Sequence, residues 1–302
     1  MQYTAHETMV APARARPQIW RILVGLLLVA LVYGLGIGLI FAVIFAASGP
    51  DGTEAWMVEM VEATGPTGTL LLLATFIGMA IGPILAARLL HGRRAGSLFG
   101  PLPRGLRHFA IALAVCAVTY GLSFLLPSDV RITPNLDRAL WLSFLPLALV
   151  GVLMQTGAEE ILFRGYLQSQ LAARFRSPLV WMVLPALTFA VLHYQPGMMG
   201  DNAIPVVAAA ALFGLLAADL TARTGSIGAA WGFHFANNVV AILLVSLDGP
   251  LSGLALYVAP VSVASAEIRP LIYADMGITV ATWLLIRLAV SRNLAPPPLP
   301  MR

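Results

Sequence analysis

Three short motifs in an otherwise apolar chain combine residue types that can hydrolyse a peptide bond. The first has two adjacent carboxylates and an arginine, the second an aromatic residue and a histidine, and the third a histidine and an asparagine. A carboxylate and an imidazole can together hold and deprotonate a water molecule. A second imidazole and an amide can donate hydrogen bonds to the oxyanion that forms when this water attacks a carbonyl carbon. The residues concerned are Glu159, Glu160, Arg164, Phe189, His193, His234 and Asn238.

Helix geometry gives the two adjacent carboxylates different roles. Arg164 follows Glu160 by four residues, so the two side chains lie on one face of a helix and can form an ion pair. Glu159 is rotated about 100° from Glu160 and keeps a carboxylate for other chemistry. An alternative is that Arg164 binds a carboxylate of the substrate.

The sequence also places Glu159 and His193 at one depth. If the turn between their helices centres on residue 176, each of them lies 17 residues from it. In an antiparallel helical hairpin both side chains are then ~25 Å from the turn, at ~1.5 Å per residue. We therefore expect the carboxylate and the imidazole to meet at one level.

The composition indicates that lipid surrounds the elements that carry these motifs. Hydrophobic residues make up 59% of the chain and charged residues 11%, and the mean hydropathy is +0.85. Soluble proteins contain ~25% charged residues. All the Lys and Arg positions are arginines, and they are dispersed, as in proteins that face anionic lipid rather than nucleic acid. Ionisable groups inside a membrane span are costly, which makes the three motifs functional candidates.

Eight segments are long and apolar enough to cross a bilayer, which needs ~20 residues per helix. The sequence therefore predicts an all-α, polytopic membrane bundle with one catalytic domain over residues 19–292, a tail over 1–18 and a Pro-rich tail over 293–302. The predicted spans are 19–47, 67–90, 108–126, 139–160 (continuing as helix to about 175), 178–195, 203–222, 226–247 and 271–291.

The distribution of arginines predicts the orientation of this bundle. Of the 18 arginines, fourteen fall in the two tails and in the gaps that share a side with them, and three fall in the opposite gaps. Positive residues accumulate on the cytoplasmic side of membrane proteins. Both termini are therefore expected to be cytoplasmic.

In this order on separate helices, the motifs Glu-Glu-x-x-x-Arg, Phe-x-x-x-His and His-x-x-x-Asn resemble those of the CPBP family. This family comprises CAAX proteases and bacteriocin-processing (Abi) enzymes and includes the Ras-converting CAAX endopeptidase. The resemblance implies an intramembrane endopeptidase in which Glu159 and His193 activate water and His234 and Asn238 stabilise the oxyanion. It also implies that Glu160 and Arg164 are a supporting ion pair.

The resemblance leaves the cofactor open between two mechanisms. A zinc-dependent metalloprotease would use Glu159, His193 and His234 as ligands. We favour a glutamate mechanism without a metal, because Asn238 beside His234 suits an oxyanion hole better than a zinc shell. No His-Glu-x-x-His motif is present.

The expected partners are a peptide or lipidated protein substrate and membrane lipid. The resemblance implies a C-terminal CAAX-type sequence, with or without a prenyl group. Arginine-only usage with alanine-rich spans indicates a GC-rich bacterial genome, so the expected location is a bacterial inner membrane. A non-catalytic alternative is a peptide-binding immunity or scaffold protein, and a structural alternative is a buried polar network. Asp275, near the outer end of the last span, is expected to be an interfacial acid.

Overall fold

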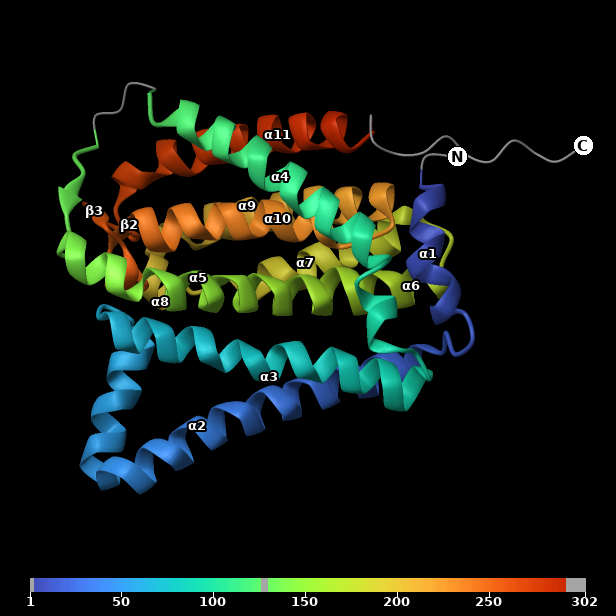
Figure 1. The fold of residues 1–302 in the computed structure, drawn as a ribbon, viewed down its shortest axis with the longest axis horizontal. Helices are drawn as coiled ribbons and strands as arrows, with labels where there is room; N and C mark the ends of the chain where they lie inside the picture. Colours follow the sequence, from blue (N-terminus) through green and yellow to red (C-terminus); the bar gives the residue numbers. More distant parts are fainter. Residues whose placement is uncertain (1–2, 126–129, 292–302) are drawn as a thin grey trace, which may run out of the picture.

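The computed structural model describes residues 3–125 and 130–291, most of which are helical (Figure 1). The predicted all-α membrane bundle of about eight helices is confirmed, and the protein is an integral, multi-pass membrane protein. Within the described residues, six helical stretches are long and apolar enough to cross a membrane: Ile19–Glu62, Pro66–His91, Ala95–Ser123, Arg138–Arg174, Pro196–Thr224 and Ala266–Ser291. Two shorter apolar stretches complete the bundle, Leu179–Val191 and Gly228–Leu244.

Most of the described residues are in α-helices, and the same part of the chain contains three π-helical stretches and three short strands. The α-helices are α1 (Glu7–Val10), α2 (Ile19–Glu62), α3 (Pro66–His91), α4 (Leu102–Ser123), α5 (Arg138–Glu160), α6 (Ser169–Arg174), α7 (Leu184–Val191), α8 (Pro196–Met199), α9 (Ala203–Thr224), α10 (Gly228–Asn238) and α11 (Arg269–Ser291). The π-helical stretches are Ile161–Gln168, Leu179–Val183 and Val239–Leu244. The strands are β1 (Thr133–Pro134), β2 (Val245–Asp248) and β3 (Tyr257–Ser262).

The first membrane helix, α2, is kinked close to the predicted end of its span. Gly49 has φ 71°, a left-handed conformation that favours glycine, and Pro50 follows it without a backbone N–H. In Figure 1 the helix diverges from α3, and the part after the kink turns back towards the start of α3. Only 6% of its most apolar stretch is buried inside the protein, so most of its leucines and valines are available to face lipid, with Val29 as a buried exception.

The helix that carries the double glutamate is continuous from Arg138 to Arg174, as predicted, but it changes its winding. Directly after Glu160 it becomes π-helical over Ile161–Gln168 and then returns to α-helix in α6. The opposite arm of the hairpin also begins with a π-helical stretch, Leu179–Val183. Such stretches are rare and are frequently found at functional sites.

Two of the predicted spans are too long. The helix in the span predicted over 178–195 ends at Val191. Helical geometry is also absent at Gln195, which precedes Pro196 and has φ −128° and ψ 70°. The span predicted over 226–247 ends at Leu244, where the chain becomes the extended strand β2. In the small sheet, β3 pairs with β2 in parallel and with β1 antiparallel, and the sequence analysis did not predict these strands.

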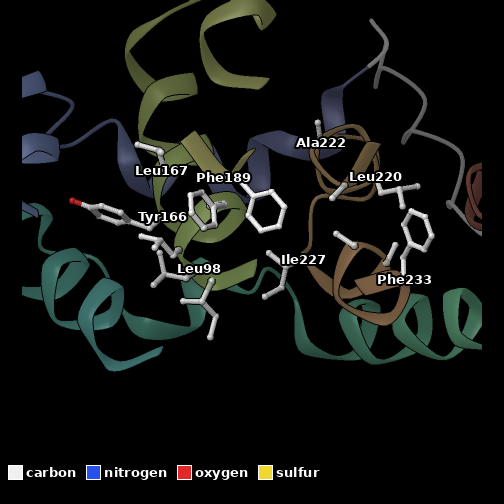
Figure 2. Packing of buried hydrophobic residues seen from close by; sticks show 14 of the residues in the cluster. Leu98, Tyr166, Leu167, Phe189, Leu220, Ala222, Ile227 and Phe233 are labelled. Atoms are coloured by element: carbon white, nitrogen blue, oxygen red, sulfur yellow. The ribbon is translucent and has the colours of Figure 1, made fainter. Parts of the chain in front are cut away.

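The core lies between the helical hairpin of α5, α6 and α7 and the pair α9 and α10. Figure 2 shows Phe189, Leu220, Ile227 and Phe233 among its packed apolar side chains. Close approach of α10 to α4 depends on Gly232, where a Cβ atom would lie 2.5 Å from the carbonyl oxygen of Phe109. Small residues at such crossings let membrane helices pack tightly.

The N-terminal segment (residues 3–13), which falls in the region expected to be a tail, is folded against the predicted cytoplasmic end of the bundle. The Tyr3 hydroxyl donates to Asp219 Oδ1 at 2.8 Å, and the Thr8 hydroxyl donates to the carbonyl oxygen of Gly225 at 2.8 Å. Arg93 Nη2 donates to the carbonyl oxygen of Met9 at 3.3 Å. The expected C-terminal tail, 293–302, lies outside the described residues.

Acidification is expected to release the N-terminal segment. His6 is buried against the Trp181 ring, 5.1 Å between centroids, and burial lowers the pKa of His6 from 6.5 to about 4. Above pH 6.5 His6 is neutral whether the segment is docked or free. Below pH 6.5 the free segment takes up a proton that the docked one does not, so docking weakens until about pH 4, by up to about 3 kcal/mol.

Hydrogen exchange of the backbone amides of this segment measures the effect. Protection, corrected for the intrinsic exchange rate, should fall about 20-fold between pH 7 and pH 5 in the wild type. The matched variant His6→Phe should lose this pH dependence. An equal loss of protection in both proteins would show that another group controls docking.

Candidate active site

The first motif forms a closed, buried ion pair. Glu160 and Arg164 are 0% and 1% exposed, and Arg164 Nη1 donates to Glu160 Oε1 at 2.9 Å. Arg164 Nη2 donates to the carbonyl oxygen of Gly214 on α9 at 3.4 Å. The guanidinium is thus held behind Glu160, in agreement with the ion pair expected from the four-residue spacing.

His234 lies between the two adjacent carboxylates, a contact that the sequence analysis did not predict. Its Nδ1 is 2.9 Å from Glu160 Oε1, and its Nε2 is 3.3 Å from Glu159 Oε2. Since Glu160 also accepts from Arg164, it is held as a carboxylate and Nδ1 of His234 carries a proton. The contact between Nε2 of His234 and Oε2 of Glu159 is then attractive only if one of these two atoms carries a proton.

His193 is held in one tautomer by the residue one turn before it. Its Nδ1 donates to the carbonyl oxygen of Phe189 at 2.9 Å, so Nε2 keeps a lone pair that can accept a proton. The Phe189 ring lies 4.6 Å from the His193 ring, 6.0 Å from the His234 ring and 5.0 Å from the Arg164 guanidinium carbon. Phe189 therefore separates the two imidazoles and covers the buried ion pair.

The four residues predicted to be catalytic line one cavity of about 250 Å³: Glu159, His193, His234 and Asn238. They come from α5, from the turn after α7 and from α10. Phe189 also lines the cavity, whereas Glu160 and Arg164 do not. Because Arg164 is buried behind Glu160, the geometry favours its supporting role over contact with a substrate carboxylate.

The polar wall of the cavity contains residues that the sequence analysis missed. Asn238 Nδ2 donates to Gln155 Oε1 at 2.8 Å, and the Asn237 amide lies 3.4 Å from Asn238 Oδ1. Gln155 precedes Glu159 by four residues, and this i,i+4 spacing was a usable signal. Asp275, expected to be an interfacial acid, lines the same cavity from α11.

The candidate zinc ligands do not come together as a metal site. Among the described residues, no three His, Cys, Asp or Glu side chains are grouped so that they could bind a metal ion. Glu159 and His234 are in contact, whereas within the described residues no hydrogen bond or ion pair links His193 to either of them. The residues present fit a three-ligand zinc shell poorly.

Comparisons with known proteins agree with the motifs. Residues 139–240 match the family described as Rce1-like, type II CAAX prenyl endopeptidase Rce1-like. The match contains all seven residues singled out above, and it supports both the resemblance to the CPBP family and a peptidase.

A curated relative matches over a similar length. The uncharacterized protein YyaK of Bacillus subtilis (strain 168) is 32% identical to this chain over 119 residues. The match covers 39% of each protein, so this chain aligns with about two fifths of that relative. No solved structure matches the chain.

Proposed function

We propose that this protein is an intramembrane, glutamate-dependent endopeptidase that cleaves membrane-associated peptides. The observation that carries the proposal is the convergence of Glu159, His193, His234 and Asn238 on one cavity of a membrane bundle. Peptide hydrolysis within a membrane requires an activated water, donors for the oxyanion and a cavity that admits both water and peptide. The match of residues 139–240 to a protease family supports the same reaction class.

In the proposed reaction, Glu159 and His193 activate the water. Glu159 is nine-tenths buried and its Oε2 makes no hydrogen bond within the described residues, while Nε2 of His193 has a free lone pair. The water oxygen attacks the scissile carbonyl carbon as its proton passes to one of these two groups. The same proton then moves to the leaving nitrogen, which departs as an amine as the C–N bond breaks.

His234 and Asn238 are proposed to stabilise the oxyanion. Asn238 Nδ2 carries two protons, one of which is bonded to Gln155, so the second is available to the substrate. When protonated, Nε2 of His234, which lies 3.3 Å from Glu159 Oε2, can donate a hydrogen bond to the oxyanion. Glu160 and Arg164 hold the opposite nitrogen of this ring and thereby fix its orientation.

The proposed substrates are C-terminal CAAX-type sequences, with or without a prenyl group, or other membrane-associated peptides. The proposed location is a bacterial inner membrane with both termini in the cytoplasm, as the arginine distribution predicts. The alternative is a non-catalytic immunity or scaffold protein that binds such a peptide in the same cavity.

A peptide-cleavage assay tests the proposal. The purified full-length protein in liposomes is incubated with prenylated and unprenylated CAAX peptides, and products are identified by mass spectrometry. Release of the last three residues is the expected result. Binding of peptides without cleavage of any of them would favour the immunity or scaffold alternative.

The same assay tests the metal-free mechanism. Activity is expected to survive EDTA, because the proposed water activation uses Glu159 and His193 alone. Loss of activity in EDTA that zinc restores would contradict this mechanism and favour the zinc-dependent form of the same protease.

A further inference from the structure

The active-site cavity contains a second acid that the proposed reaction does not use. Asp275 projects from α11 and lines the cavity together with Thr279 of the same helix. Glu159 and Asp275 are the charged side chains among the described residues that line it, and the remaining ionisable ones are His193 and His234. The cavity wall therefore presents carboxyl groups on two of its sides, from α5 and from α11.

Arg164, the arginine of the first motif, does not pair with Glu159 or Asp275. Arg164 is fully engaged by Glu160 and by the carbonyl oxygen of Gly214 and does not line the cavity. Within the described residues, Asp275 itself has neither an ion pair nor a hydrogen bond. The Asp275 side chain is exposed and lines the cavity, so its carboxyl group is accessible to a ligand. A cationic group of a ligand would supply the missing partner.

We propose that Asp275 determines specificity by binding the cationic side chain of a lysine or arginine beside the scissile bond of the substrate. This inference rests on the proposed peptidase function and names its substrate class. Opposite charges attract strongly in a cavity that is only partly open to water, and like charges repel equally strongly. The same wall therefore disfavours substrates that carry a carboxylate close to the cleaved bond.

Matched peptides that differ by one charge test this inference. One membrane-associated sequence is prepared with Lys, Gln or Glu at each position flanking the scissile bond, and kcat/KM is measured for each. In the wild type we expect the Lys peptide to exceed the Gln peptide by about tenfold at one of these positions, as for a single partly screened ion pair. The Glu peptide should be the poorest.

Variants of Asp275 and a control variant distinguish an effect of this residue from an effect of the overall charge of the protein. Asp275→Asn should bring the Lys-to-Gln ratio to about one, and Asp275→Glu should restore a preference for Lys. The control Glu267→Gln removes the same charge from the exposed end of the helical region before α11, outside the cavity, and should keep the wild-type ratio. A wild-type ratio of one at every position, or an unchanged ratio in Asp275→Asn, overturns the inference.

Measurements of peptide binding test the role of Asp275 even if the protein does not cleave the peptides. Affinities of the Lys and Gln peptides are measured on Glu159→Gln protein with Asp275 intact or replaced by Asn. A Lys preference that disappears with Asp275→Asn supports the cationic site even if no peptide is cleaved. Cleavage without any charge preference would remove this inference and leave the proposed peptidase standing.

Discussion

Glu159→Gln lowers the turnover of peptide cleavage by about 10³-fold, the loss expected when a group that moves a proton in the transition state is removed. Gln has nearly the shape of Glu but cannot accept the proton of the attacking water. Oε2 of Glu159 is the buried carboxylate oxygen at the cavity that makes no hydrogen bond within the described residues. The measurement is the initial rate of product release by wild-type and variant proteins at equal concentration.

Two comparisons keep this result interpretable. The thermal unfolding midpoint of Glu159→Gln should stay close to that of the wild type, since the contact of Glu159 with His234 is long, at 3.3 Å. Glu54→Gln removes an exposed acid of α2 and should leave the rate unchanged. Wild-type rates in Glu159→Gln would remove this residue from the chemistry, and retained peptide binding without any wild-type turnover would favour the scaffold alternative.

Arg164→Met is expected to produce the largest loss of stability, about 3–5 kcal/mol. The substitution leaves Glu160 fully buried, with His234 as its remaining partner. Losing one member of a buried pair is costly because the other charge stays in a low-dielectric environment without compensation. Unfolding of the purified protein by SDS in mixed micelles measures the change in free energy.

A double variant and a control distinguish this cause from simple loss of packing. Glu160→Gln combined with Arg164→Met removes both charges and should recover part of the lost free energy. Arg94→Met alters an exposed arginine and should cost less than about 0.5 kcal/mol. If Arg164→Met were as stable as the wild type, the buried ion pair of Glu160 and Arg164 would not contribute to the stability of the protein.

Much of the site could be predicted because helical periodicity fixes local geometry. The four-residue spacing of Glu160 and Arg164 was enough to predict their ion pair, which the structure contains. Equal distances of Glu159 and His193 from one turn predicted a common depth, and both line the same cavity. Their catalytic roles stay predictions.

Other features depend on how distant helices pack, which one-dimensional spacing does not encode. The contact of His234 with both glutamates depends on the docking of α10 against the change from α-helix to π-helix after Glu160. Asp275 reaches the cavity because of the position of α11, although its place in the sequence suggests an interfacial residue. The small sheet joins strands that are each too short to give a recognisable alternation.

The docked N-terminal segment has a consequence for biosynthesis. Tyr3 is hydrogen-bonded to Asp219, 216 positions later in the chain, and Asp219 also accepts from Trp283 of α11. The ribosome therefore makes Tyr3 long before Asp219 and Trp283, the residues that complete this cluster of hydrogen bonds. The N-terminal segment cannot dock in this way until α9 and α11 have been made and inserted, so its docking reports that these two helices are in place.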